Sequence, residues 1–159
     1  QEPEDYWNAV CAATRSVLDK TGINPQLVAG LAFGTQWKGI IPIDKNGKVM
    51  HRSIIWMDAR GVEEAAMLNA HFKTDAFSAS DLWVRLWWLR RHKPAMIDDE
   101  AVILEANGYL KWRATGEFAI DIGVDNKPHG TQYLQSRNCI PVEFVLYTIG
   151  MNPRFNIRI

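Results

Sequence analysis

The sequence has little cysteine and no excess of charge of either sign. Its 159 residues include two cysteines, Cys11 and Cys139, which form neither a metal-ligand spacing nor a disulfide framework. Lysine plus arginine total 18 and aspartate plus glutamate total 18, so no overall field attracts nucleic acid or an anionic membrane. We therefore expect reduced thiols in a cytoplasmic protein with no nucleic-acid or membrane partner.

Several motifs that would identify an enzyme class directly are also missing. No apolar run is long enough to span a bilayer or to act as a secretory signal. The sequence contains no G-x-x-x-x-G-K-[ST] loop, no G-x-G-x-x-G loop and no serine-hydrolase elbow. The four histidines are scattered without zinc-ligand spacing. We therefore assign no catalytic residue, no metal site and no cofactor-binding residue from local motifs.

What the chain does contain is an alternation of helical and strand-like periods, which is typical of an α/β fold. Apolar residues make up 47% and charged residues 23% of the chain, and 159 residues suffice for one domain. The expected helices cover residues 3–19, 62–72, 81–92 and 107–114. The expected strands cover residues 27–34, 38–44, 53–57 and 101–104.

Local signals set the ends of these elements. Pro3 and the acidic residues around it start the first helix, and Gly22 ends it. Its apolar residues predict one buried stripe: Trp7, Val10, Cys11, Thr14, Val17 and Leu18. Asn46-Gly47 predicts a hairpin with a type I′ turn, and residues 78–80 predict the cap of the helix over 81–92.

The candidate site lies where two expected strands end. The apolar run 27–33 reads as a buried strand that stops at Gly34, and Gln36, Trp37 and Lys38 follow it. Asp58 and Arg60 follow the strand over 53–57 in the same way. An amide, a cation, a carboxylate and an aromatic face together suit a polyhydroxylated ligand. An ordinary strand–turn–strand at 34–39 and a structural Asp58–Arg60 ion pair are the alternatives.

The segment from Trp83 to Lys93 combines three tryptophans with basic residues. Stacking and phosphate contacts by such a segment could bind nucleic acid or a membrane surface. Tryptophans at helical spacing more often belong to a core, and the net charge is zero. We therefore interpret this helix as part of the core.

Four stretches in order make residues 1–126 resemble the N-terminal domain of the FGGY family of carbohydrate kinases, in particular its xylulokinase-like members. Residues 28–44 resemble its substrate loop between two strands, and 54–60 (Ile-Ile-Trp-Met-Asp-Ala-Arg) its Trp-Asn-Asp-x-Arg motif. Residues 85–92 are similar to its Lys-Leu-x-Trp-Leu-x-x-His helix. Residues 109–121 resemble its Tyr-Leu-x-x-x-Leu-Thr-Gly-Glu-Phe-Ala-x-Asp stretch.

The resemblance implies a partial ribonuclease-H-like (actin-like ATPase) domain with a mixed sheet flanked by helices. It also implies a parent enzyme that transfers phosphate from ATP, with Mg²⁺, to a hydroxyl of a sugar or polyol, a xylulose-like ketose first. Kinases for glycerol, ribulose or a sugar acid, and a non-catalytic sugar-binding or regulatory module, remain alternatives. The family's phosphate loop and catalytic Asp would lie upstream and downstream of this chain. We therefore expect the chain alone to be inactive and to bind neither cofactor tightly, and the parent could be a homodimer.

The chain departs from the family pattern at positions that matter for the substrate. Trp37-Lys38 stands where xylulokinase-like members have Met-His and glycerol kinases an Arg-Glu pair, and Arg85 replaces the usual Lys. In the resembling family this loop contacts sugar, so Gln36, Trp37 and Lys38 are the first candidates for substrate contact and Asp58 and Arg60 the second. Residues 127–159 match nothing in the family pattern, and we expect a divergent, poorly packed tail there.

Overall fold

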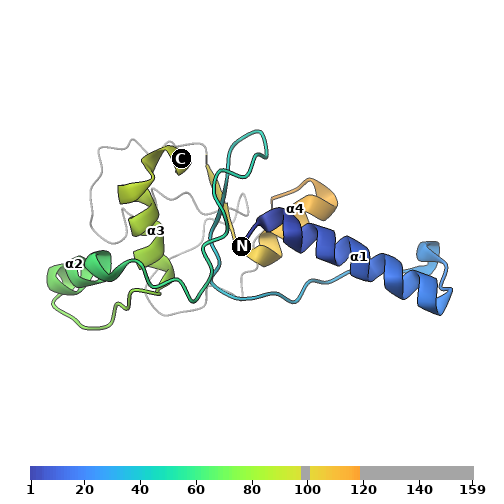
Figure 1. Cartoon of the computed structure of the whole chain (residues 1–159), viewed down its shortest axis with the longest axis horizontal. Helices are drawn as coiled ribbons and strands as arrows, with labels where there is room; N and C mark the ends of the chain where they lie inside the picture. Colours follow the sequence, from blue (N-terminus) through green and yellow to red (C-terminus); the bar gives the residue numbers. More distant parts are fainter. Residues whose placement is uncertain (98–100, 119–159) are drawn as a thin grey trace.

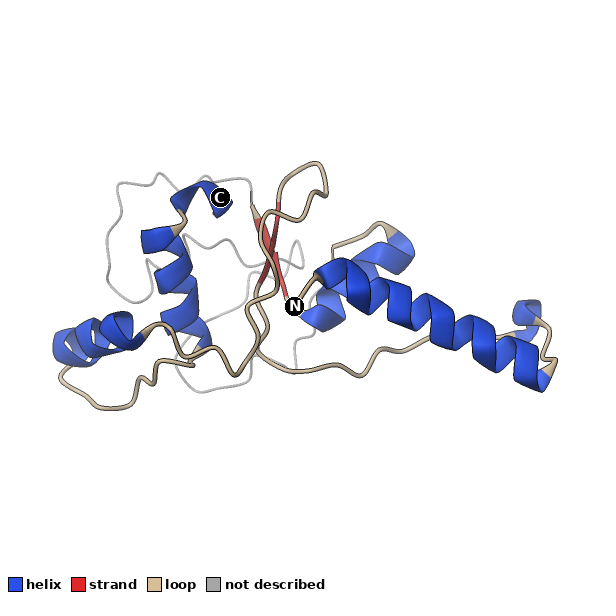
Figure 2. Cartoon of the chain, in the orientation of Figure 1, coloured by secondary structure: helices blue, strands red, loops and turns tan. Residues whose placement is uncertain are grey.

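The computed structural model describes residues 1–97 and 101–118, and it places two pairs of helices on opposite sides of a narrow β ribbon (Figure 1). The helices are α1 (Pro3–Thr21), α2 (Val62–Phe72), α3 (Leu82–His92) and α4 (Ala106–Thr115). The strands are β1 (Ile41–Ile43) and β2 (Val102–Leu104), and η1 (Pro25–Leu27) and η2 (Pro94–Met96) are short 3-10 helices. In Figure 2 the red strands lie between α2 and α3 on one side and α1 and α4 on the other.

The ribbon is antiparallel and separates two apolar cores. Ile41 lies opposite Leu104 and Ile43 opposite Val102. Successive side chains of a strand point to opposite faces. Ile41 and Ile43 therefore pack towards α1 and α4, while Ile40 packs towards α2 and α3. Each pair of helices therefore packs against one face of the ribbon.

Both cores are built from residues of the expected helices. The first joins Ile40 and Ile54 to apolar residues of α2 and α3, including Leu68, Leu86, Trp87 and Leu89. The second joins Ile41, Ile43 and Leu104 to Tyr109 and Leu110 of α4, with Trp7 and Val10 of α1 packed against it. The interpretation of the tryptophan-rich helix as a core helix is therefore confirmed.

The predicted strand over residues 27–34 is wrong. Leu27 belongs to η1, and residues 28–36 have no regular secondary structure. Leu27, Val28 and Leu31 are 77%, 52% and 64% exposed. A strand needs a neighbour to pair its backbone groups. The only sheet among the described residues is the β1–β2 pair, so this apolar run is an exposed connection.

Three further predictions, two about strands and one about a turn, need correction. Residues 53–57 form only an isolated bridge, between Ile54 and Ile40, and the described sheet is antiparallel rather than mixed. The hairpin at residues 44–48 is present, but Gly47 has φ 82° and Asn46 does not have a positive φ. The Gly47 N–H donates a hydrogen bond to Asp44 O at 3.0 Å. This is a type I turn followed by a left-handed glycine rather than type I′.

The four predicted helices are confirmed, with differences at their ends. Gly22 and Gly116 end α1 and α4 in the left-handed conformation, where glycine costs least. The N-cap of α3 is Asp81, not a residue of 78–80, and it makes no side-chain cap bond. The predicted stripe of α1 is only partly buried, because the helix runs beyond the core and leaves Val17 56% exposed.

None of the helices in the described part of the chain is long and apolar enough to cross a membrane. The predicted tail over residues 127–159 lies outside the described residues, and the division of the chain at residue 126 stays a prediction.

Candidate functional site

A hollow of about 310 Å³ lies where three segments meet near the start of α3. Its lining residues are Trp37, Lys38, Trp56, Ser80 and Asp81. Trp37 and Trp56 are 46% and 53% exposed, although tryptophan is usually well buried. Two large aromatic side chains thus remain open to solvent at one place on the surface.

Polar groups of both signs share this hollow with the aromatic rings. The Lys38 ammonium lies 4.5 Å from the centroid of the Trp37 ring, a cation–π distance. The Asp81 carboxylate accepts a hydrogen bond from the Ser78 N–H at 2.8 Å, on Oδ2. A carboxylate has about four acceptor positions, so Asp81 can still accept from a ligand hydroxyl.

Lys38 has an unusual backbone conformation, with φ 58°. A non-glycine residue in the left-handed region carries strain, which often marks a site where geometry matters. The Lys38 carbonyl accepts a 2.6 Å hydrogen bond from the buried Arg85 side chain. This hydrogen bond therefore restrains the backbone at Trp37 and Lys38.

The chemistry of the hollow fits a small polyhydroxylated molecule. Aromatic faces cover the C–H surface of such a molecule, an ammonium donates to its oxygens and a carboxylate accepts from its hydroxyls. Of the predicted site residues, the structure brings Trp37 and Lys38 together here.

Gln36 lies elsewhere. Its amide Nε2 donates 2.9 Å hydrogen bonds to Oε1 of Gln1 and to the Tyr6 hydroxyl at the start of α1. This contact ties the loop to α1, and Asn107 fixes the same loop by donating to Phe33 O at 2.8 Å. Gln36 is not among the residues that line the hollow.

Asp58 and Arg60 form an ion pair with each other. Arg60 donates from Nε to Oδ1 at 2.8 Å and from Nη2 to Oδ2 at 2.6 Å. The Arg60 guanidinium also stacks over the Trp88 ring of α3, 4.6 Å from its centroid. This is the structural arrangement that the sequence left open as an alternative, and neither residue lines the hollow.

Loss of this ion pair should appear as a pH-dependent loss of stability. Burial alone would raise the pKa of Asp58, but the hydrogen bonds and charge of Arg60, with a smaller contribution from Arg85, leave that pKa lowered. A lowered pKa in the folded state stabilises the protein above the unfolded value, near 3.9, and that stability is lost as the pH falls towards the folded pKa. We expect Asp58→Asn to lower the free energy of unfolding by about 1 kcal/mol at pH 7, a small value because Arg60 is 44% exposed.

Urea unfolding of the wild type and Asp58→Asn at pH 7 and near pH 3 measures this effect, with Asp19→Asn on exposed α1 as the control. The difference should shrink at the lower pH. An equal difference at both pH values would show that the ionised form of Asp58 contributes nothing.

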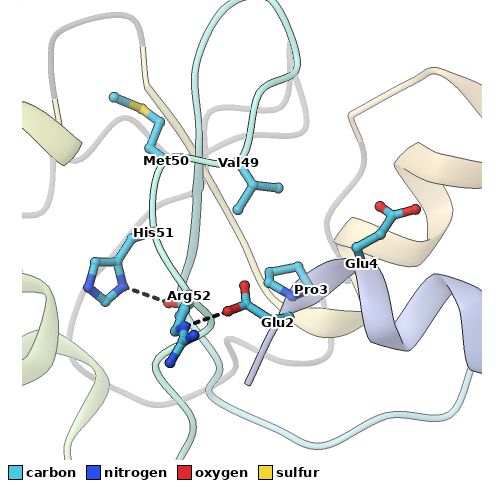
Figure 3. A pocket seen from close by; sticks show the side chains of 7 residues that line it. All are labelled: Glu2, Pro3, Glu4, Val49, Met50, His51 and Arg52. Atoms are coloured by element: carbon cyan, nitrogen blue, oxygen red, sulfur yellow. Dashed lines mark hydrogen bonds and ion pairs between the residues drawn. The ribbon is translucent and has the colours of Figure 1, made fainter.

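A second hollow, of about 290 Å³, lies between the start of α1 and the strand return at residues 49–52 (Figure 3). Arg52 forms an ion pair with Glu2 across it, and the His51 Nδ1 lies 2.7 Å from Arg52 O. Glu4 lies apart from this pair and bonds to Arg113 and Tyr109 of α4. No aromatic side chain lines this hollow apart from the His51 ring, so it suits a sugar less well.

One group of side chains in the described part of the chain has metal-ligand composition: Glu63, Glu64 and His92. Glu64 is almost fully buried and its Oε1 already accepts from Arg91 Nη1 at 2.6 Å and contacts His92 Nε2 at 3.0 Å. An arginine inside the group neutralises the charge that would attract a cation. These residues link α2 to α3 and do not fit a magnesium site.

Sequence reasoning missed Trp56, Ser80 and Asp81. Trp56 belongs to the expected strand over 53–57, and the sequence made only the polar residues after it, Asp58 and Arg60, site candidates. An aromatic residue directly after a short apolar run was the available signal. Ser80 and Asp81 meet the other segments through the packing of α3, and the only local signal there was the predicted helix cap at residues 78–80.

Comparison with known proteins shows the family to which the chain belongs. Residues 1–127 match the N-terminal domain of the FGGY family of carbohydrate kinases. The chain is 29% identical over 128 residues to the xylulose kinase of Escherichia coli K12, covering 77% of this chain and 26% of that protein. It is 28% identical over 128 residues to a glycerol kinase of Bradyrhizobium sp. strain BTAi1, covering 72% and 26%. The chain thus spans about a quarter of the length of the curated relatives it matches.

Solved structures agree on the fold. A xylulose kinase from Brucella ovis matches with a TM-score of 0.66 and 23% identity, over 74% of this chain and 26% of that one. A xylulose kinase from Rhodospirillum rubrum matches with a TM-score of 0.63 and 24% identity, over 76% and 27%. The predicted α/β class with a partial actin-like ATPase fold is confirmed. The chain belongs to the FGGY family of carbohydrate kinases and matches its N-terminal domain.

Proposed function

We propose that the hollow between Trp37 and Trp56 is the sugar-binding surface of an ATP-dependent carbohydrate kinase. The observation that carries the proposal is the pairing of two exposed tryptophans with an ammonium and a carboxylate in one hollow. Phosphoryl transfer depends on positioning the acceptor hydroxyl, and a rigid surface of this kind positions a sugar. Trp37 and Lys38 contact the sugar, joined by Trp56 and Asp81.

A xylulose-like ketose is the first candidate substrate, because xylulose kinases stand among the most similar relatives. Glycerol, ribulose and sugar acids follow, and one relative is named an L-xylulose/3-keto-L-gulonate kinase. The Lys38 ammonium favours an acceptor that also carries a carboxylate or several hydroxyl oxygens. Gln36, Asp58 and Arg60 support the surface from outside the hollow.

ATP and Mg²⁺ belong to the activity of the family, but the residues described here do not fit them. The sequence carries no glycine-rich phosphate loop of the common kinds, and the one carboxylate–histidine group in the described ranges is already paired with Arg91. We therefore assign sugar binding to this chain and phosphate transfer to a longer, cytoplasmic parent protein that could be a homodimer. A non-catalytic sugar-binding module on the same fold is the competing function.

Titration of the ¹⁵N-labelled 159-residue chain with D-xylulose, D-ribulose, glycerol and an aldonate tests the proposal. The indole N–H resonances of Trp37 and Trp56 should shift on addition of a ketose or polyol at millimolar concentration, and that of Trp112 should not. Incubation with ATP and Mg²⁺ should produce no sugar phosphate. If no compound moves the two indole resonances, the hollow is not a sugar site. Formation of a sugar phosphate by this chain would contradict the assignment of phosphate transfer to the longer parent protein.

A further inference from the structure

The segments that line the hollow are hydrogen-bonded to one buried cation, Arg85. Arg85, in the first turns of α3, is 0% exposed. Its guanidinium donates four hydrogen bonds, all to backbone carbonyl oxygens. Nε bonds to Ser80 O at 2.9 Å, Nη2 to Lys38 O at 2.6 Å, and Nη1 to Ile55 O at 2.6 Å and to Ile54 O at 3.2 Å.

These carbonyls belong to the three segments that line the hollow. Lys38 lines it together with its neighbour Trp37, Ile55 directly precedes Trp56, and Ser80 lines it beside Asp81. The Arg85 side chain hydrogen-bonds to all three segments. The Ile40–Ile54 backbone bridge already joins two of these segments, and the Arg85 guanidinium links both of them to the third.

A guanidinium holds such an arrangement better than an ammonium would. Its donors point in fixed, coplanar directions, whereas the three donors of a lysine rotate about a single atom. The short bond to the Lys38 carbonyl also restrains the peptide that follows this residue, which has an unfavourable positive φ.

The charge of Arg85 persists in this position. Burial lowers the pKa of Arg85, while the negative charges of Asp58, Asp81 and Glu105 oppose that change. A guanidinium stays protonated in proteins near neutral pH. The four carbonyl bonds are therefore charge-assisted and stronger than neutral bonds, and the two at 2.6 Å are also short.

We propose that Arg85 is a positioning residue for the sugar surface: it sets the spacing of Trp37, Trp56 and Asp81 by binding the backbone of all three lining segments. This inference rests on the proposed function of the hollow. Arg85 does not itself line the hollow and acts only through the segments it holds.

Fluorine NMR of the 159-residue chain labelled with 5-fluorotryptophan tests the arrangement without requiring a ligand. The seven tryptophans give seven lines, assigned by single Trp→Phe variants. The variants are Arg85→Met and Arg85→Lys. Arg85→Met removes the hydrogen-bond donors, and Arg85→Lys keeps the positive charge but loses the coplanar arrangement of donors. Leu89→Ala is the matched control, because Leu89 is equally buried in the same helix but packs in the apolar core.

We expect Arg85→Met to shift or broaden the Trp37 and Trp56 lines, leave the Trp112 line in place and weaken sugar binding at least tenfold. Arg85→Lys should show the same changes to a smaller extent. Leu89→Ala should lower the melting temperature without altering sugar affinity or the Trp37 and Trp56 lines. If Arg85→Met does not fold, the decision rests on Arg85→Lys.

Folded Arg85 variants that keep both lines and the wild-type affinity would overturn the positioning role and leave Arg85 a purely structural residue. If both lines move but the wild type binds no sugar, the proposed function fails while the control of the hollow by Arg85 is supported. If the lines stay while the wild type binds sugar normally, the proposed function stands and this inference fails.

Discussion

Lys38→Ala should weaken sugar binding by the 159-residue chain about 5- to 150-fold, or about 1–3 kcal/mol, the scale of a hydrogen bond to a charged group. The Lys38 ammonium is the cation that lines the hollow, beside the Trp37 ring. Removing it leaves the hydroxyl oxygens of the sugar with one donor fewer. In a longer, active parent protein the same change should lower kcat/KM for the sugar and leave the KM for ATP unchanged.

The two tryptophans should have effects of similar size. Trp37→Ala and Trp56→Ala each remove one aromatic wall of the hollow, with both the stacking surface and the exclusion of water. Calorimetric or NMR titration across ketoses, polyols and sugar acids measures the change for each sugar. Lys48→Ala and Met57→Ala are matched controls, since both residues are exposed and neither lines the hollow.

The pattern across the panel carries the information about the substrate. If Lys38→Ala affects sugar acids more than ketoses, the ammonium pairs with a substrate carboxylate. If Trp37→Ala and Lys38→Ala leave the affinity for every sugar unchanged, these residues are structural and the substrate site lies elsewhere.

The second large effect concerns stability. Leu104→Ala should lower the free energy of unfolding by about 2–5 kcal/mol, because it opens a cavity in a packed core. Leu104 is 1% exposed, lies opposite Ile41 in the ribbon and belongs to the core that the ribbon shares with α1 and α4. Leu104 therefore contributes both to the pairing of β1 with β2 and to the packing of the ribbon against the helices.

Leu31→Ala is the matched comparison, with the same atoms removed from the apolar run that the sequence predicted to be a buried strand. Leu31 is 64% exposed, so we expect a change within about 0.5 kcal/mol. Urea unfolding followed by circular dichroism measures both variants. A cost of 2 kcal/mol or more for Leu31→Ala would show that residues 27–34 are buried in solution.

The helices could be predicted because their signals are local. Pro3 with the acidic residues beside it, and the glycines Gly22 and Gly116, act within one turn of the chain. The predicted tryptophan-rich helix formed for the same reason, since its apolar spacing needs no distant partner to be recognised. Four motifs in the expected order were also sufficient to suggest the family.

Strands were predicted less well, because a strand exists only where another one pairs with it. Residues 27–34 are as apolar as residues 40–43, and composition cannot distinguish them. Ile41 and Ile43 find Leu104 and Val102 some 60 positions further along the chain, as the register shows. Leu31 has no such neighbour among the described strands, so the same kind of sequence remains an exposed connection.

The helix positions and the family could be inferred from the sequence, because each follows from residues that are close together in the chain, and Trp37 and Lys38 stay a prediction made from the same kind of local signal. Which residues line the hollow depends on tertiary packing, because they come from three segments that are distant in the sequence. Packing of α3 against the ribbon places Asp81 and Ser80 beside Trp37 and Trp56. It also buries Arg85 where one guanidinium reaches the carbonyls of Lys38, Ile55 and Ser80, positions that are up to 47 residues away in the sequence. Local pattern cannot specify such a site, because a rigid planar donor acts on whatever backbone the fold brings within hydrogen-bonding distance.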